Sequence, residues 1–279
     1  MPTPILGTAY WGWKIPAPTA FDLLDALYAA GFREIDTATN YPINKIPEDF
    51  RKAEMILSDW INAHGIRDLK ITAKVGSINN LRSPEHLLTQ SFLLMCLDAY
   101  HQMWGANLDT FMVHWDNRDA RSEIRDTMEA LAYAGEKGWR PGLSGILRPD
   151  IYADLNKDFG LDFRIQFKHN ILESKYEHYK PFHGAKRFVA YGINAGGAKI
   201  GADPRLDFLK PILEKANERK DRPPIEHFFQ VGILFAYLHP DMESILIGPS
   251  SVEQLEKNLA FFRRLEAFDY TDFFEPQRR

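Results

Sequence analysis

Short apolar runs alternate along the chain with longer segments in which apolar residues recur every three or four positions. Runs of this length, bounded by turn residues, are typical of buried strands. Seven of them lie at residues 33–38, 69–75, 109–115, 139–146, 162–169, 187–193 and 244–249, and an eighth is expected within residues 4–11.

The longer segments have the spacing of amphipathic helices. In residues 18–31, Phe21, Leu24 and Leu27 share one helical face, and Gly31 stands where a helix commonly ends. Residues 251–265 begin with Ser and Glu at capping positions. Residues 194–226 are rich in Gly, Pro and charge, which predicts a long loop with a helix inside it.

Strands that alternate with helices are expected to be parallel, because each return connection needs a crossover. About eight such units in 279 residues suit a closed (β/α)8 TIM barrel of the α/β class. The sequence therefore predicts a single barrel domain over residues 1–279.

The composition excludes some classes of function. The formal net charge is −4, which gives no reason to expect binding to nucleic acid or to a membrane surface. The chain begins without the basic start and apolar core of a signal peptide, and no apolar stretch approaches the roughly 18 residues of a membrane span. Cys96 is the single cysteine. We therefore expect a cytoplasmic protein without a disulfide framework.

Polar residues interrupt three consecutive predicted strands near their ends. Asp36, Lys74 and His114 occupy these positions, and Tyr41 follows Asp36 in the next loop. Each residue alone has an ordinary structural explanation, such as an ion-paired surface lysine or a core histidine. In a barrel, however, the carboxyl ends of the strands meet at the catalytic face, so four such residues together predict an active site.

These four residues have a coherent chemistry. An unperturbed tyrosine titrates near pH 10, and the ammonium of Lys74 is expected to lower the pKa of Tyr41. Asp36 would keep Lys74 charged and paired. His114 could donate a hydrogen bond to a substrate oxygen and orient it towards Tyr41. Such a site suits a carbonyl that accepts a proton while a hydride reaches its carbon.

Several motifs give the chain a resemblance to a known family. They are "LGTAYWGW", "GFREIDTATNY", "AEMILSDWI", "ITAKV", "LDTFMVHWD", "GLSGI" and "ESILIGPSSVEQLEKNL". In this order and at these distances they resemble the aldo-keto reductase family along nearly the whole chain. The resemblance implies an NAD(P)H-dependent reductase of aldehydes or ketones, with Tyr41 as general acid or base, Asp36 and Lys74 tuning it, and His114 orienting the carbonyl.

The resemblance also implies a cofactor site, with NADPH preferred and NADH possible. In this cofactor site Ser144 and Gln166 would hold the nicotinamide carboxamide, and Tyr191 would stack on the nicotinamide ring. Gly248, Ser250 and Ser251 would bind phosphate at the N-terminus of a helix. Gln254 and Asn258 would contact the adenosine end. A Rossmann-type "GxGxxG" motif is absent from the sequence.

Trp11, Trp13 and Trp115 resemble the aromatic wall of the family's substrate pocket. Such a wall favours an apolar or ring-bearing carbonyl compound. The partner that we expect is thus a small molecule. The sequence predicts no metal site and does not define an oligomeric state.

The chain departs from the family pattern at several positions. Gly145 stands where Asn is common, and Gln254 stands where many NADP-preferring members have Arg, although Lys257 could replace that charge. Residues 194–204 are unusually rich in glycine. The tail after the last predicted helix is too short for the long loop that shapes many substrate pockets of the family.

Two other functions fit the same residues. A reductase-like barrel could act as a nicotinamide-binding regulatory subunit with little turnover. Alternatively, Lys74 could form a Schiff base in a TIM-barrel lyase, although the adjacent Asp36 and Tyr41 favour hydride transfer.

Overall fold

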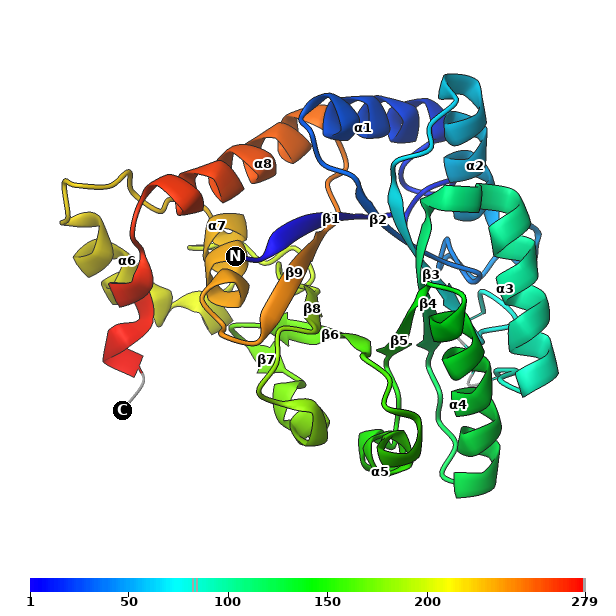
Figure 1. Ribbon diagram of the computed structural model, residues 1–279. Helices are drawn as coiled ribbons and strands as arrows, with labels where there is room; N and C mark the ends of the chain where they lie inside the picture. Colours follow the sequence, from blue (N-terminus) through cyan, green and yellow to red (C-terminus); the bar gives the residue numbers. More distant parts are fainter. Residues whose placement is uncertain (82, 84, 278–279) are drawn as a thin grey trace.

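A computed structural model describes residues 1–81, 83 and 85–277. Its centre is a closed barrel of eight parallel strands, as the sequence predicts (Figure 1). Hydrogen bonds between the first and last barrel strands, and between β5 and β6, complete the circle. The barrel strands are β1 (Thr3–Gly7), β2 (Glu34–Ala38), β3 (Lys70–Val75), β4 (Leu108–His114), β5 (Arg140–Ser144), β6 (Arg164–Asn170), β8 (Phe188–Tyr191) and β9 (Met242–Ile247).

Helices surround the barrel and cover its outer surface (Figure 1). The α-helices are α1 (Ala17–Ala29), α2 (Lys52–His64), α3 (Gln90–Trp104), α4 (Arg121–Glu136), α5 (Pro149–Phe159), α6 (Leu209–Asn217), α7 (Phe228–Tyr237) and α8 (Val252–Ala267). Short 3-10 helices occur at η1 (Pro47–Asp49), η2 (Gly105–Asn107), η3 (Tyr176–Phe182), η4 (Pro204–Leu206) and η5 (Thr271–Gln277).

The helix predictions agree with these elements. Helix α1 lies within one or two residues of the predicted range, and Gly31 follows its end with a left-handed φ of +90°, which glycine adopts without strain. Ser251 caps α8 by accepting a hydrogen bond from the Gln254 amide at 3.3 Å. Residues 194–226 form a long connection that contains η4 and α6.

The connection after β6 differs from the regular barrel pattern. The chain turns into β7 (Glu173–Ser174), which pairs antiparallel with the end of β6, and then into η3 instead of an α-helix. The side chain of Asn170 accepts hydrogen bonds from the amides of Leu172 and Glu173 and so fixes the turn. Pro181 lies within η3 and is unfavourable for a longer α-helix there.

Charged side chains surround the buried Arg164 at the amino-terminal end of the barrel. Arg164, the first residue of β6, donates to Glu34 at 2.5 Å and to Ser244 at 2.9 Å. Glu243 pairs with Arg164 at 3.2 Å and with Arg140 at 2.7 Å. These ion pairs join the starts of β2, β5, β6 and β9, although Nε of Arg140 and Nε of Arg164 are buried without a hydrogen-bond partner among the described residues.

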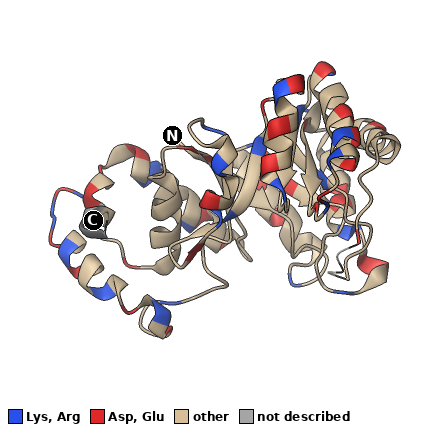
Figure 2. Ribbon diagram, turned by 90° about the horizontal axis from the view of Figure 1, so that it is seen from below, with Lys and Arg blue, Asp and Glu red and all other residues tan. Residues whose placement is uncertain are grey.

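The outer helices carry charges of both signs. Figure 2 shows Lys and Arg interspersed with Asp and Glu along these helices. Among the residues that the structure describes, no helix combines the length and apolar character that a membrane crossing requires.

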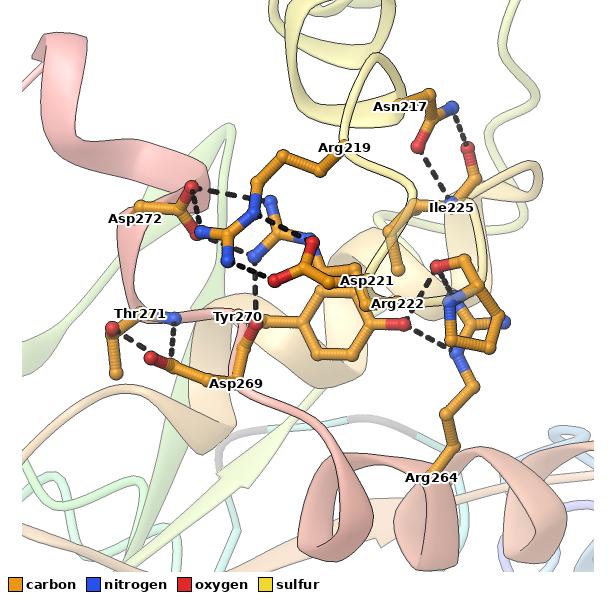
Figure 3. A network of polar contacts seen from close by, with 11 residues as sticks. Asn217, Arg219, Asp221, Arg222, Ile225, Arg264, Asp269, Tyr270, Thr271 and Asp272 are labelled. Carbon is orange, nitrogen blue, oxygen red and sulfur yellow. Dashed lines mark hydrogen bonds and ion pairs between the residues drawn. The ribbon is translucent and has the colours of Figure 1, made fainter.

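The C-terminal segment is fixed to the connection between α6 and α7 by a polar network (Figure 3). Arg222 has a nearly buried side chain, donates to the Asp269 carbonyl at 2.7 Å, pairs with Asp272, and lies over the Tyr270 ring. Arg264 donates to the Tyr270 hydroxyl at 2.6 Å. The segment therefore packs beside α6, at the outside of the barrel.

We predict that Arg222→Met lowers the free energy of unfolding by about 2 kcal/mol, because the change leaves Asp272 and a backbone carbonyl without their buried donor. Urea denaturation of the purified protein measures this loss. Arg219→Met is the matched control: Arg219 also pairs with Asp272, but its side chain is 41% exposed, so the loss should be much smaller. Equal losses in the two variants would contradict the assignment.

Candidate active site

Asp36 and Lys74 form a buried ion pair inside the carboxyl-terminal half of the barrel. Strands β2 and β3 are parallel, and Ala38 lies beside Lys74 in their register. Both charged side chains point into the barrel, where each is only 1% exposed. Lys74 Nζ donates to Asp36 Oδ1 at 2.5 Å. Since a buried charge is unstable without a partner, each residue requires the other.

Tyr41 lies above this pair. The Tyr41 amide donates to the carbonyl of Ala38 at 3.1 Å, and this turn brings the side chain back over the barrel. Lys74 Nζ donates to the Tyr41 hydroxyl at 3.0 Å. The predicted contact between the phenol and the ammonium is therefore present, at hydrogen-bonding distance.

The net effect on the acidity of Tyr41 differs from the sequence expectation. Burial raises the pKa of the Tyr41 phenol, and the Lys74 ammonium offsets this rise only in part. Burial also opposes the charge on Lys74, but Asp36 and Tyr41 together raise the pKa of the lysine above its ordinary value. At neutral pH the site thus holds a protonated phenol beside a permanent positive charge, which is the form that a proton donor needs.

His114 ends β4 and faces Tyr41. The two rings meet edge to face with centroids 6.2 Å apart. Burial lowers the pKa of His114 well below its ordinary range, and the charge of Lys74 lowers it further. The imidazole is therefore neutral at neutral pH. Its buried Nδ1 has no hydrogen-bond partner among the described residues, so the protein leaves hydrogen-bonding capacity of this ring unused.

Trp115 and Gly145 fit against each other beside His114. The Trp115 indole lies 4.6 Å from the imidazole, centroid to centroid. Trp115 has a left-handed φ of +59°, which is unusual for a bulky residue, and its amide donates to the Ser144 carbonyl at 2.8 Å. A Cβ atom on Gly145 would lie only 2.6 Å from Trp115 Cδ1. The glycine that departs from the family pattern therefore makes room for this indole.

Ser144 and Gln166 lie in the same buried cluster. Ser144 Oγ donates to Gln166 Oε1 at 3.2 Å. Gln166 also contacts the ion pair, through Nε2 to Asp36 Oδ2 at 2.7 Å and through Oε1 to Lys74 Nζ at 2.9 Å. The structure thus joins these two predicted cofactor residues to the predicted proton-transfer residues.

Tyr191 ends β8 and is half-buried at the same end of the barrel. Burial raises the pKa of the Tyr191 phenol, and the nearby Tyr41 raises it further. A cavity of about 440 Å³ adjoins this ring and is lined by Gly145, Ile146, Phe167, Lys168, Tyr179 and Tyr191, among others. Most of this wall is apolar, as small-molecule pockets commonly are.

The three predicted pocket tryptophans occupy different environments. Trp115 lies beside His114, as described above. Trp13 is 40% exposed on the loop after β1, where it packs against Tyr10 and Lys14. Trp11 is fully buried, because the loop folds back and pairs Trp11 with Ile15. In this structure the Trp11 side chain offers no surface to a substrate.

A second cavity of about 680 Å³ lies beside the start of α8. Gly248, Gln254 and Asn258, all predicted to contact the cofactor, form part of its wall. The wall also contains residues that the sequence analysis did not select: Asn194, Lys199, Ile200, His227, Phe228 and Phe229. Asn194, Lys199 and Ile200 belong to the glycine-rich segment 194–204, which was the only sign of them in the sequence. No motif in the sequence indicated a binding role for the residues at the start of α7.

Ser250 and Ser251 lie at the N-terminus of α8, where the side chain of Gln254 folds back over them. Both the amide and the hydroxyl of Ser250 donate to Gln254 Oε1 at 3.0 Å. Gln254 therefore occupies a place at which a phosphate would meet the free amides of the helix. A phosphate bound there would take over these hydrogen bonds.

The state of Lys74 is unsuited to Schiff-base chemistry. That reaction needs a neutral amine, whereas Lys74 Nζ donates to Asp36, Tyr41 and Gln166, and its pKa is raised above the ordinary value. The geometry favours proton transfer through Tyr41 over a lyase mechanism.

Comparison with known proteins shows similarity to a protein family and to a relative. The model of the aldo/keto reductase family matches residues 5–199, which include the end of β1, all of β2 to β8, and the four residues Asp36, Tyr41, Lys74 and His114. A relative from Pseudescherichia vulneris, described as an uncharacterized 11.2 kDa protein in the crtE 3′ region, is 42% identical over 84 residues. That alignment covers 28% of this chain and 77% of the relative.

We predict that Gly145→Asn, which introduces the residue common in the family, lowers the free energy of unfolding by about 1–3 kcal/mol, because the new side chain overlaps the Trp115 indole. Urea denaturation measures the effect. In a Trp115→Ala background the same change should cost much less, since the overlapping indole is gone. An equal loss in both backgrounds would show that the two positions are independent.

Proposed function

The chain belongs to the aldo/keto reductase family, and from this we propose that it is an NAD(P)H-dependent oxidoreductase that reduces an aldehyde or ketone to the alcohol, or catalyses the reverse reaction. The observation that carries the proposal is the hydrogen bond from Lys74 Nζ to the Tyr41 hydroxyl, at 3.0 Å, above a buried partner carboxylate. This contact supports a role for Tyr41 as proton donor, because the phenolate that Tyr41 would become lies next to the positive charge of Lys74.

A nicotinamide cofactor held near Tyr191 would supply the hydride that the carbonyl carbon accepts. Tyr41 donates its hydroxyl proton to the carbonyl oxygen as the C=O π bond opens, so the product is a neutral alcohol. The phenolate left on Tyr41 is stabilised by Lys74 until it takes a proton from solvent. Neutral His114 donates a hydrogen bond to the same oxygen and orients the carbonyl.

The cofactor would extend from Tyr191 to the cavity beside α8. Its nicotinamide ring would stack on the half-buried Tyr191 ring, and its adenosine end would lie near Gly248, Gln254 and Asn258. Lys199 and Lys257 belong to the wall of this cavity, and their charges would favour the 2′-phosphate of NADPH over the hydroxyl of NADH.

The substrate is proposed to be a small apolar or aromatic carbonyl compound. The apolar wall near Gly145, Phe167 and Tyr179 supports this choice. The C-terminal segment is held beside α6 by Arg222, which fits a pocket that this segment does not cover. We propose a cytoplasmic location for the protein, which is consistent with a reduced nicotinamide as cofactor.

We predict that Tyr41→Phe lowers kcat/KM for carbonyl reduction about 1,000-fold, because the ring remains but the transferred proton is lost. The dissociation constant of NADPH, measured by fluorescence titration, should change less than about twofold, which makes cofactor binding the internal control. A panel of aldehydes and ketones should be assayed with both proteins. If both bind NADPH and neither turns over any compound, the regulatory-subunit alternative is favoured and the enzymatic proposal fails.

We predict that Lys199→Ala and Lys257→Ala each weaken NADPH binding about tenfold and leave NADH binding nearly unchanged, because only NADPH carries the 2′-phosphate. Lys210→Ala is the matched control: this exposed lysine of α6 pairs with Asp207 and should affect neither nucleotide. Equal losses for NADPH and NADH would place the lysines elsewhere on the nucleotide.

A further inference from the structure

Gln166 uses both ends of its amide inside the buried charge cluster. The side chain is 2% exposed. Its Nε2 donates to Asp36 Oδ2 at 2.7 Å, while its Oε1 accepts from Lys74 Nζ at 2.9 Å. The reverse orientation of the amide would set its NH2 group against the ammonium and its oxygen against the carboxylate. Asp36 and Lys74 therefore determine the orientation of Gln166.

Gln166 also completes the hydrogen bonding of the lysine. An ammonium has three N–H donors, and Lys74 Nζ meets three acceptors: Asp36 Oδ1 at 2.5 Å, Gln166 Oε1 at 2.9 Å and the Tyr41 hydroxyl at 3.0 Å. With every donor used, rotation of the ammonium would break hydrogen bonds in a buried site. The third acceptor is Tyr41, whose own hydroxyl proton must then point away from Lys74.

The carboxylate of Asp36 depends on Gln166 in the same way. Its Oδ1 accepts from Lys74 and its Oδ2 accepts from Gln166. Without the glutamine, a buried carboxylate oxygen would lose its donor and compete for the lysine. Lys74 would then be free to turn from Tyr41 towards Asp36.

We propose that Gln166 is a positioning residue for proton transfer, which holds Lys74 between Asp36 and Tyr41, in addition to any contact that it makes with the nicotinamide carboxamide. The consequence for catalysis rests on the proposed function. The consequence for Lys74 does not, because the ion pair and its hydrogen bonds belong to the protein alone.

The direct test is 15N NMR of the lysine NH3+ groups in the full-length protein, without cofactor or substrate. The Lys74 resonance is assigned by its absence in Lys74→Met. In the wild type we expect a slowly exchanging ammonium whose rotation is restricted. Gln166→Met, which keeps the length but removes the amide, should increase solvent exchange at least tenfold. Gln166→Asn, which is too short to reach both partners, serves as a second variant in case the first does not fold.

Ser144→Ala is the matched control, because Ser144 contacts Gln166 Oε1 at 3.2 Å but not Lys74. The exchange rate of Lys74 should change less than twofold in this variant. An unchanged Lys74 signal in Gln166→Met or Gln166→Asn would overturn the proposal, whether or not the protein is an active reductase.

A kinetic test separates positioning from contact with the carboxamide. Single-turnover rates are measured with NADPH and with the 3-acetylpyridine analogue, in which an acetyl group replaces the carboxamide. A misplaced proton donor should slow Gln166→Met about 100-fold with both cofactors. A loss that is confined to NADPH would instead assign Gln166 to the carboxamide and contradict the positioning role. Absence of turnover in the wild type would refute the proposed function but leave the NMR result decisive for Lys74.

Discussion

The buried ion pair of Asp36 and Lys74 is the constraint on which the rest of the site depends. Two charges that are almost inaccessible to water are stable only if every donor and acceptor around them is satisfied. Tyr41 and Gln166 supply the remaining hydrogen bonds, so they are fixed by the same requirement. The Lys74 ammonium, which is charged at neutral pH, thus lies beside the hydroxyl of Tyr41, where a phenolate would form.

Both ends of the barrel hold a buried positive charge that is paired with carboxylates. At the amino-terminal end, Arg164 pairs with the carboxylates of Glu34 and Glu243 and donates to the Ser244 hydroxyl. At the carboxyl-terminal end, the cluster around Lys74 lies below a mouth where the neutral ring of His114 has an unused buried nitrogen. The ion pairs at the amino-terminal end join neighbouring strands, whereas the cluster around Lys74 lies at the end of the barrel where ligands bind in this fold.

Much of this arrangement could be predicted from the sequence, because strand and helix periodicities are local. All eight barrel strands fall within the predicted runs or within two residues of them. The polar residues predicted near the strand ends lie close together in the structure, and their role in proton transfer stays a prediction. Long-range partners were harder to predict. A strand pattern places Gln166 inside the barrel but does not show that it bonds Asp36. Likewise, the burial of Trp11 follows from the folded shape of its loop, which the sequence does not show. The sequence also does not show how deeply Tyr41 is buried, and this burial raises the pKa of Tyr41 more than the charge of Lys74 lowers it.

The most direct test of the role of Lys74 is the pH dependence of kcat/KM for carbonyl reduction in the wild type and in Lys74→Met. Reduction needs protonated Tyr41, so the rate falls as pH rises through the pKa of that phenol. The ammonium lowers this pKa, and its removal should move the alkaline fall to higher pH while reducing the rate at neutral pH about 100-fold or more. An alkaline fall at the same pH with an unchanged neutral rate would contradict the account.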